Sequence, residues 1–228
     1  MTDDAGSAAA EEMGEFFNRR AAIYESHMFE SGFDAATYQE AVRPLPQTDR
    51  PVKVLDLGCG TGLELQYLLA RLPNAEVTCI DLSEQLLAIL KQHFQDRLEQ
   101  IEMIHDSYLT WKYPSTAYDA VIAVNTMHHL TRERKVELYR KIRSSLKPGG
   151  RYVEADYIVD QAVMEQYQAR YRRLLAAAPA RPDGYYHIDI PMTVALQQEI
   201  LLEAGFAEVE LFAANVQPKG SRAVLLAY

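Results

Sequence analysis

The stretch VLDLGCGTG at residues 54–62 decides the fold. An apolar, β-prone run ends in three closely spaced glycines, and a helical pattern of leucines follows from residue 65. Glycine adopts positive φ at little cost and lets a ligand approach the main chain without a Cβ in the way. A strand that runs into such a loop and then into a helix predicts a nucleotide-type binding site at Gly58, Gly60 and Gly62.

The residues around these glycines indicate which kind of nucleotide is bound. The dinucleotide fingerprint requires glycine at position 63, where this chain has Leu63, and the Gly-Lys-Ser/Thr of a phosphate-binding P-loop is missing. Asp56 stands two residues before the first glycine, where a carboxylate repels a pyrophosphate and suits a cationic ligand. The alternative for Asp56 is a structural role, in which its carboxylate orders the loop by accepting hydrogen bonds from main-chain amides.

Two further carboxylates follow the next strand-like runs. Asp81 ends the second run, about twenty residues on, where an acid can accept both hydroxyls of a ribose. Asp106 follows the third run, in a position to accept from an adenine amine. Asp81 could instead cap a helix, but Ser83 is available for that role. The carboxyl ends of parallel strands meet at one edge of a sheet, so the three acids are expected in one site.

Strands and helices alternate along the middle of the chain. This alternation predicts right-handed βαβ crossovers and a mostly parallel sheet covered on both faces. Towards the C-terminus, a long helical pattern and a loop rich in Pro, Gly and Tyr look like an insertion over the sheet. The last two expected strands have no helix between them, and this predicts an antiparallel hairpin at the edge of the sheet. The expected strands lie at 52–57, 76–81, 101–105, 119–124, 151–157, 207–213 and 223–228, and the expected helices at 11–27, 33–42, 83–95, 132–146, 161–178 and 193–204.

Five short segments, taken in order, resemble the motifs of the class I S-adenosylmethionine-dependent methyltransferases. The resemblance implies an α/β fold with a doubly wound, seven-stranded, mostly parallel sheet, an antiparallel last strand and helical lid segments. It implies a helical lid over 1–47 and a Rossmann-like domain over 48–228, with a helical substrate-covering insertion around 160–192. The segments are DLGCGTG at 56–62, DLS at 81–83, DS at 106–107, YDAVI at 118–122 and LKPGGR at 146–151.

The resemblance also implies S-adenosyl-L-methionine as the cofactor and in-line methyl transfer as the reaction. Tyr24 belongs to the N-terminal helix that folds over the cofactor in similar enzymes, although it could equally be a core residue. Cys59 is expected as a small loop residue and not as a nucleophile. The expected cofactor-binding residues are Tyr24, Asp56, Gly58, Cys59, Gly60, Gly62, Asp81, Leu82, Asp106, Ser107, Val124 and Asn125.

The acceptor side is less defined by the residues. An oxygen acceptor needs a base, for which His129, after the fourth strand, and His187, in the expected covering loop, are the catalytic candidates. No metal site is expected, because the histidines at 105, 128 and 129 have no recognised ligand spacing with nearby acids. The aromatic residues expected to line a pocket for a small-molecule O, N or S acceptor are Tyr108, Trp111, Tyr113, Tyr157, Tyr185 and Tyr186.

Composition limits the partners. The net charge of −9 argues against binding of nucleic acid. The sequence contains no run of about twenty apolar residues, so no membrane span is expected. The basic residues of 132–143 are expected on a solvated helix face, and the two cysteines and the absence of a targeting pattern predict a cytoplasmic protein. Three alternatives stay open: a tRNA or protein methyltransferase, a nicotinamide-dependent oxidoreductase, and a non-catalytic S-adenosylmethionine-binding protein. No pattern indicates an oligomeric state.

Overall fold

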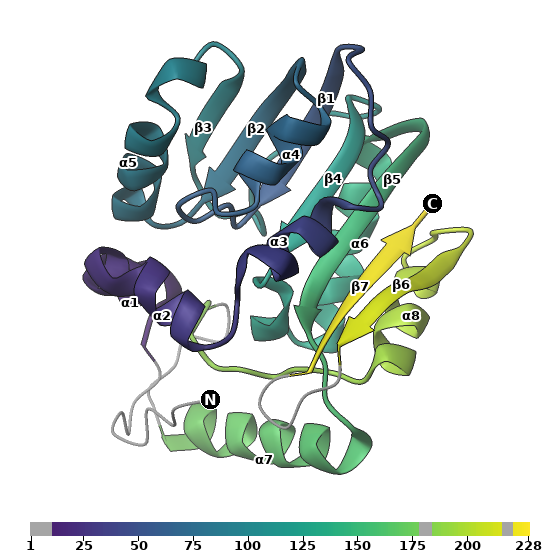
Figure 1. Ribbon diagram of the computed structural model, residues 1–228. Coiled ribbons are helices and arrows are strands. Elements are labelled where there is room, and N and C mark those ends of the chain that lie inside the picture. The colour runs from purple at the N-terminus through teal and green to yellow at the C-terminus, as the bar shows by residue number, and fades with distance from the viewer. Residues whose placement is uncertain (1–10, 178–183, 216–220) are drawn as a thin grey trace.

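One seven-stranded sheet forms the centre of the computed structural model, which describes residues 11–177, 184–215 and 221–228 (Figure 1). The strand order is β3-β2-β1-β4-β5-β7-β6, and only the pairings of β7 are antiparallel. This arrangement confirms the expected fold class. The strands are β1 (Val52–Leu57), β2 (Ala75–Asp81), β3 (Ile101–His105), β4 (Tyr118–Val124), β5 (Leu146–Tyr157), β6 (Val209–Asn215) and β7 (Arg222–Ala227).

Helices cover both faces of the sheet and enclose two apolar cores. Adjacent strand residues point to opposite faces, so Val54 packs in one core and Leu55 in the other. The first core contains residues of α3 (Ala35–Val42), α4 (Leu65–Arg71) and α5 (Glu84–His93). The second contains residues of α6 (Arg132–Ser145) and α8 (Val194–Glu203). The described helices include none that is both long and apolar enough to cross a bilayer.

The N-terminal segment differs from the single helix expected over 11–27. It forms α1 (Met13–Arg20), one 3₁₀ turn (Ala21–Ile23) and α2 (Tyr24–Glu30). The backbone leaves α-helical geometry at Arg20, with φ −101° and ψ 2°, and again at Ile23, with φ −114° and ψ 1°. These two breaks let α1 and α2 follow the carboxyl ends of the parallel strands instead of running straight past them (Figure 1).

The C-terminal strands pair antiparallel, as expected, but β7 lies between β5 and β6, so only β6 is the edge strand. The connection at 216–220 lies outside the described residues, as does the part of the expected insertion at 178–183. The described part of that insertion contains α7 (Gln161–Ala177), which lies at the same end of the sheet as α1 and α2 (Figure 1).

A buried polar network joins α6, β5 and α8. Glu154, 1% exposed, accepts hydrogen bonds from Tyr139 (2.6 Å), Tyr152 (2.8 Å) and Gln197 (2.7 Å). Lys135 is fully buried, and its Nζ donates to Gln197 Oε1 (2.8 Å) and lies 3.6 Å from Glu154 Oε1. The expectation that the basic residues of 132–143 form one solvated face is therefore wrong for Lys135, because it supplies the positive charge that a buried carboxylate requires.

Candidate active site

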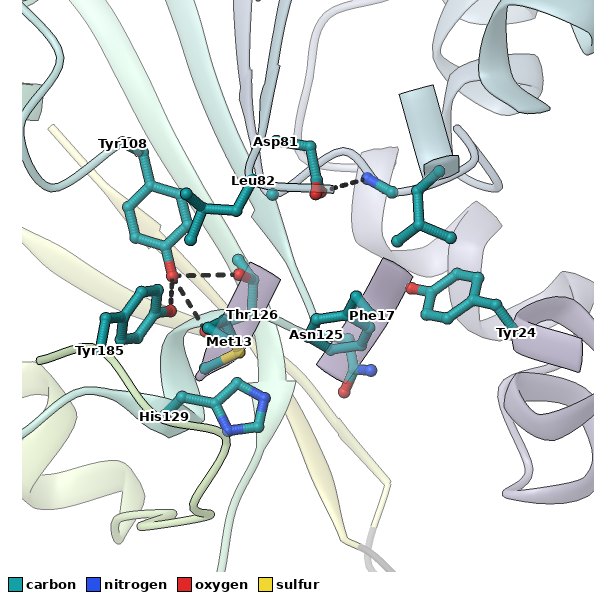
Figure 2. A pocket seen from close by; sticks show the side chains of 13 residues that line it. Met13, Phe17, Tyr24, Asp81, Leu82, Tyr108, Asn125, Thr126, His129 and Tyr185 are labelled. Atoms are coloured by element: carbon teal, nitrogen blue, oxygen red, sulfur yellow. Dashed lines mark hydrogen bonds between the residues drawn. The ribbon is translucent and has the colours of Figure 1, made fainter. Parts of the chain in front are cut away.

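The glycine loop after β1 forms one wall of a pocket at the carboxyl ends of the strands (Figure 2). Gly58 and Gly60 line it with φ of +70° and +52°. A Cβ on Gly58 would lie 2.4 Å from Thr126 Oγ1, and one on Gly60 would lie 3.2 Å from the Tyr24 hydroxyl. Both glycines are therefore needed for the backbone conformation and for the close approach of neighbouring groups. A Cβ on Gly62 would instead meet Leu65 and Phe94 at 3.0 Å, so that glycine serves helix packing.

Asp81 holds the loop in place from the end of β2. Its Oδ2 accepts from the Gly60 amide (2.9 Å) and its Oδ1 from the Ser83 amide (2.8 Å). Ser83 caps α5 through its own side chain, as the sequence indicated. A carboxylate has about four acceptor positions, so Asp81, which lines the pocket, keeps acceptor capacity for a ligand.

Asp56 and Glu64 are buried acids behind the glycine loop, at 1% and 5% exposure. While both are ionised, neither Asp56 oxygen nor Glu64 Oε1 has a hydrogen-bond donor among the described residues, and protonation of one acid lets the two bond to each other. Burial, followed by the charge of Glu64, raises the pKa of Asp56 well above its usual range. Burial also raises the pKa of Glu64 from 4.5 to about 7, and the charge of Asp81 adds to this. Asp81 lines the pocket, whereas Asp56 and Glu64 do not, so these two acids lie behind its wall.

The N-terminal helices close the pocket from the opposite side (Figure 2). Met13 and Phe17 of α1 and Tyr24 of α2 line it, and burial raises the pKa of Tyr24 well above its usual range. Asn18 fixes α1 to the start of α5, because its Oδ1 accepts from the Ser83 hydroxyl (2.7 Å) and the Gln85 amide (3.2 Å). The cavity between these walls measures about 30 Å³, which leaves room for only a few water molecules.

The segment at 185–187 forms a third wall and is paired with the N-terminal segment. The Met13 amide donates to the Tyr185 carbonyl (3.0 Å), and the His187 amide donates to the Glu11 carbonyl (2.9 Å). The Tyr185 hydroxyl bonds to the Tyr108 hydroxyl, which also lies 3.2 Å from Thr126 Oγ1 (Figure 2). Of the aromatic residues expected at the pocket, Tyr108 and Tyr185 line it, whereas Trp111, Tyr113, Tyr157 and Tyr186 are not among its lining residues.

The remaining expected cofactor residues divide between the pocket and its surroundings. Leu82 and Asn125 line the pocket, and Asn125 has a positive φ of 55° with its Oδ1 unpartnered among the described residues. Cys59 and Val124 are buried in the core behind the loop. Asp106 and Ser107 lie beside the pocket without lining it, since the Asp106 amide donates to the Asp81 carbonyl (3.2 Å).

Three histidines gather beside this pocket. His128 Nδ1 lies 2.7 Å from Asp156 Oδ1, and its amide donates to Asp156 Oδ2 (2.9 Å). Burial opposes the charge of His128, but Asp156 outweighs burial and raises the pKa of the imidazole. His129 lines the pocket, and burial together with the charge of His128 lowers its pKa. Burial and His129 lower the pKa of His187 to about 3, so this imidazole is neutral near pH 7.

Comparisons with known proteins agree with this geometry. Residues 54–150 match the family model described as a methyltransferase domain. Residues 54–150 therefore form a methyltransferase domain, in agreement with the class I S-adenosylmethionine-dependent motifs that the sequence resembles. The DhpI protein in complex with SAM and HEP shares the methyltransferase fold, with a TM-score of 0.67 and 21% identity over 93% of this chain and 94% of that one.

Curated relatives of the methyltransferase domain match over different lengths. The chain is 27% identical to the carboxy-S-adenosyl-L-methionine synthase of Wolinella succinogenes, over 69% of each chain. It is 34% identical to the demethylmenaquinone methyltransferase of Thermus thermophilus, over 47% of this chain and 48% of that one. Among four curated relatives, the matched share of the relative's own length runs from 25% to 69%.

Several residues of the site in this methyltransferase domain were not singled out in the sequence. Glu64 looked like an ordinary residue of the helix after the glycines, although an acid in an apolar run is a recognisable signal of a buried carboxylate. Met13 and Phe17 fall within the helix expected over 11–27, but nothing local indicates that they reach the pocket. Asp156 and Asp189 are separated from their histidine partners by many residues, so only the fold brings them together.

Proposed function

We propose that the chain methylates a small-molecule oxygen, nitrogen or sulfur acceptor with S-adenosyl-L-methionine as the methyl donor. The observation that carries the proposal is the glycine loop held by Asp81 above a cluster of buried carboxylates. The family and fold of the domain support the reaction type.

The residues present fit this cofactor. The cofactor supplies a methyl group activated by a positively charged sulfur, and it also carries an ammonium group and a ribose. Asp56 and Glu64 have raised pKa values and unpartnered oxygens, so a nearby cation would stabilise their ionised forms. Gly58 and Gly60 give close access to the main chain, and Asp81 offers free acceptor positions for the ribose hydroxyls.

The remaining predicted cofactor residues take supporting positions in this proposal. Tyr24 and Leu82 bound the pocket, while Asp106 and Ser107 lie next to Asp81 on the side proposed for the adenine. Cys59, Gly62 and Val124 act through packing behind the loop, and Asn125 places a side-chain amide at the end of β4.

The proposed lid consists of the N-terminal segment within 1–47, together with the described part of the insertion around 160–192. Since the cavity measures only about 30 Å³, α1 and α2 must move before a nucleoside enters. Closure then excludes water, which favours transfer from a cationic donor because charge is dispersed in the transition state. The protein's main contribution is to align acceptor, methyl carbon and sulfur.

For an oxygen acceptor, His129 is the proposed base and His187 its neighbour. The Nδ1 atom of His129 lies 3.3 Å from Asp189 Oδ1. Because the pKa of His129 is lowered, its imidazole is neutral near pH 7 and can accept a proton. Tyr108 and Tyr185 place hydroxyl groups on the same wall, where they can orient a polar acceptor. The net charge of −9 supports a small molecule over RNA.

Incubation of the chain with S-adenosylmethionine labelled in the methyl group tests the proposal. The label should enter a small-molecule extract fraction, and the variant Asp81→Ala should lose both cofactor binding and transfer, while Asp96→Asn, an exposed acid, behaves as wild type. Label in RNA or protein fractions would support the other acceptor classes. Calorimetric binding of NAD(H) without S-adenosylmethionine binding would favour an oxidoreductase, and cofactor binding without transfer to any fraction would favour a non-catalytic protein.

A further inference from the structure

Two imidazoles and a carboxylate converge beside the pocket wall. His128 Nε2 lies 3.8 Å and His129 Nδ1 lies 3.3 Å from Asp189 Oδ1. One ligand atom from each of the three residues lies within 4.8 Å of the others, among the residues that the structure describes. Four-coordinate zinc with bonds of about 2.0–2.1 Å places its ligand atoms about 3.3 Å apart. The two distances to Asp189, 3.3 and 3.8 Å, approach this value.

His128 is already oriented by a second carboxylate. Its Nδ1 lies 2.7 Å from Asp156 Oδ1, and Asp156 is 3% exposed. In the neutral imidazole, Nδ1–H donates to Asp156, which leaves the lone pair of Nε2 available to a metal ion. A carboxylate that holds the far nitrogen of a histidine is also the usual outer partner of a metal-binding histidine.

His129 supplies an independent observation. Its side chain is only 4% exposed, and its Nδ1 has no partner with hydrogen-bond geometry among the described residues, although Asp189 is near. A buried nitrogen in that position costs free energy unless something binds it. The atom lies 3.3 Å from Asp189 Oδ1, and a shared ion would satisfy both.

The backbone holds Asp189 beside the histidines. The Ile190 amide donates to the His128 carbonyl (2.8 Å), and a parallel bridge joins Met192 to Ile158 just after β5. The segment that carries Asp189 is thus hydrogen-bonded to the backbone of His128, in the turn that holds both histidines (the histidine turn), and this bond fixes the position of the carboxylate. Its side chain is 37% exposed, which leaves a route for an ion to enter.

We propose that His128, His129 and Asp189 bind one divalent first-row transition-metal ion, such as Zn²⁺, at the wall of the acceptor pocket. Two imidazoles and one carboxylate suit such an ion better than Mg²⁺ or Ca²⁺, which prefer oxygen ligands. Three protein ligands leave a position for an exogenous oxygen. This inference rests on the proposed function where it concerns the acceptor: the ion would bind an acceptor hydroxyl and lower its pKa, and His129 would then be a ligand and not the base.

The sequence predicted no metal site, because a metal-binding motif is recognised from ligands that lie close together along the chain. His128 and His129 are adjacent, and Asp189 follows sixty residues later, in a different segment of the chain. No ligand motif of that spacing is recognisable without the fold.

Cobalt binding tests the site directly. The tag-free, EDTA-treated chain is titrated with Co²⁺ while its visible absorption is recorded, and Zn²⁺ is then added as a competitor. We expect a saturable one-to-one signal that Zn²⁺ abolishes. Asp189→Asn and His129→Gln should weaken Co²⁺ binding by at least about tenfold, and Asp156→Asn by about 10–100-fold. His93→Ala, an exposed histidine 3.5 Å from Glu25, is the matched control and should bind as wild type.

The outcomes separate this inference from the proposed function. Circular dichroism and S-adenosylmethionine calorimetry confirm that each variant is folded. A folded, cofactor-binding wild type that gives no saturable Co²⁺ signal overturns the metal site and leaves the methyltransferase proposal intact. Equal Co²⁺ affinity in wild type and Asp189→Asn also overturns it. Saturable Co²⁺ binding that depends on Asp189, in a chain that binds no S-adenosylmethionine, supports the metal site and contradicts the proposed cofactor.

Discussion

Replacing Glu64 with glutamine should raise the stability of the ligand-free protein and lower its affinity for the cofactor. Glu64 is 5% exposed and its Oε1 has no partner among the described residues, so its ionised form is poorly solvated. The rise of its pKa from 4.5 to about 7 corresponds to about 3 kcal/mol, at about 1.4 kcal/mol per pKa unit. Glu64→Gln removes this cost and also relieves Asp56, whose pKa is raised partly by the charge of Glu64.

The pH dependence gives the sign of the effect. A carboxyl group whose pKa is higher in the folded than in the unfolded state contributes stability below its unfolded pKa, and that contribution is lost as the pH rises through the folded pKa. For Glu64 the loss should fall between pH 4.5 and about 7. The free energy of unfolding in urea should therefore be higher for Glu64→Gln than for wild type, by up to about 3 kcal/mol near pH 8. This difference should shrink near pH 5.

Calorimetry with S-adenosylmethionine provides the second half of the test. Loss of one negative charge beneath the pocket should weaken binding of the cationic cofactor by about tenfold, or about 1.4 kcal/mol. Glu137→Gln, an exposed acid on α6, is the control and should change neither quantity. If Glu64→Gln is no more stable than Glu137→Gln near pH 8, the buried acid cluster does not carry the strain inferred from its burial.

Three further predictions concern the loop, the core and the acceptor wall. Gly58→Ala should cost more than about 1–2 kcal/mol of stability, because its Cβ would lie 2.4 Å from Thr126 Oγ1. The variant should also lose cofactor binding in calorimetry. Gly149→Ala, at a similar φ with open space around it, should leave binding unchanged. Lys135→Met should lower the free energy of unfolding in urea by about 3–5 kcal/mol, since Glu154 then loses its buried counter-charge, whereas the exposed Arg140→Met should have little effect. Tyr185→Phe should reduce methyl transfer to the acceptor while cofactor affinity stays constant, and Tyr171→Phe on α7 should match wild type; an equal fall in both quantities for Tyr185→Phe would place that hydroxyl in cofactor binding instead.

The sheet could be predicted because its signals are local. An apolar run followed by a turn fixes a buried strand, and β3 (Ile101–His105) has the expected bounds. Gly58, Gly60 and Asp81 were also predictable, because a loop that crosses the end of a parallel sheet requires small residues and places acids where ligands bind. Their placement in one pocket follows from strand order.

The rest depends on contacts between distant segments. Lys135 sits in a row of basic residues, and only the packing of α6 against β5 and α8 shows that it faces Glu154. The break between α1 and α2 has no proline or glycine to mark it, so it reflects tertiary packing of Phe17 and Tyr24 over the pocket. Asp189 reaches His129 only because its segment bonds to the histidine turn.

The same hydrogen bonds that close the pocket also couple its two sides. Met13 and Glu11 bond to Tyr185 and His187, so the lid over the cofactor and the wall proposed for the acceptor form one backbone-paired unit. A cavity of about 30 Å³ admits no nucleoside until α1 moves, and moving α1 breaks those bonds or carries the 185–187 segment with it. The proposed acceptor wall is therefore disturbed while the cofactor enters and is restored when α1 returns. This coupling predicts ordered binding, with the cofactor first, because an acceptor already held against the paired wall would oppose the movement of α1 that cofactor entry requires.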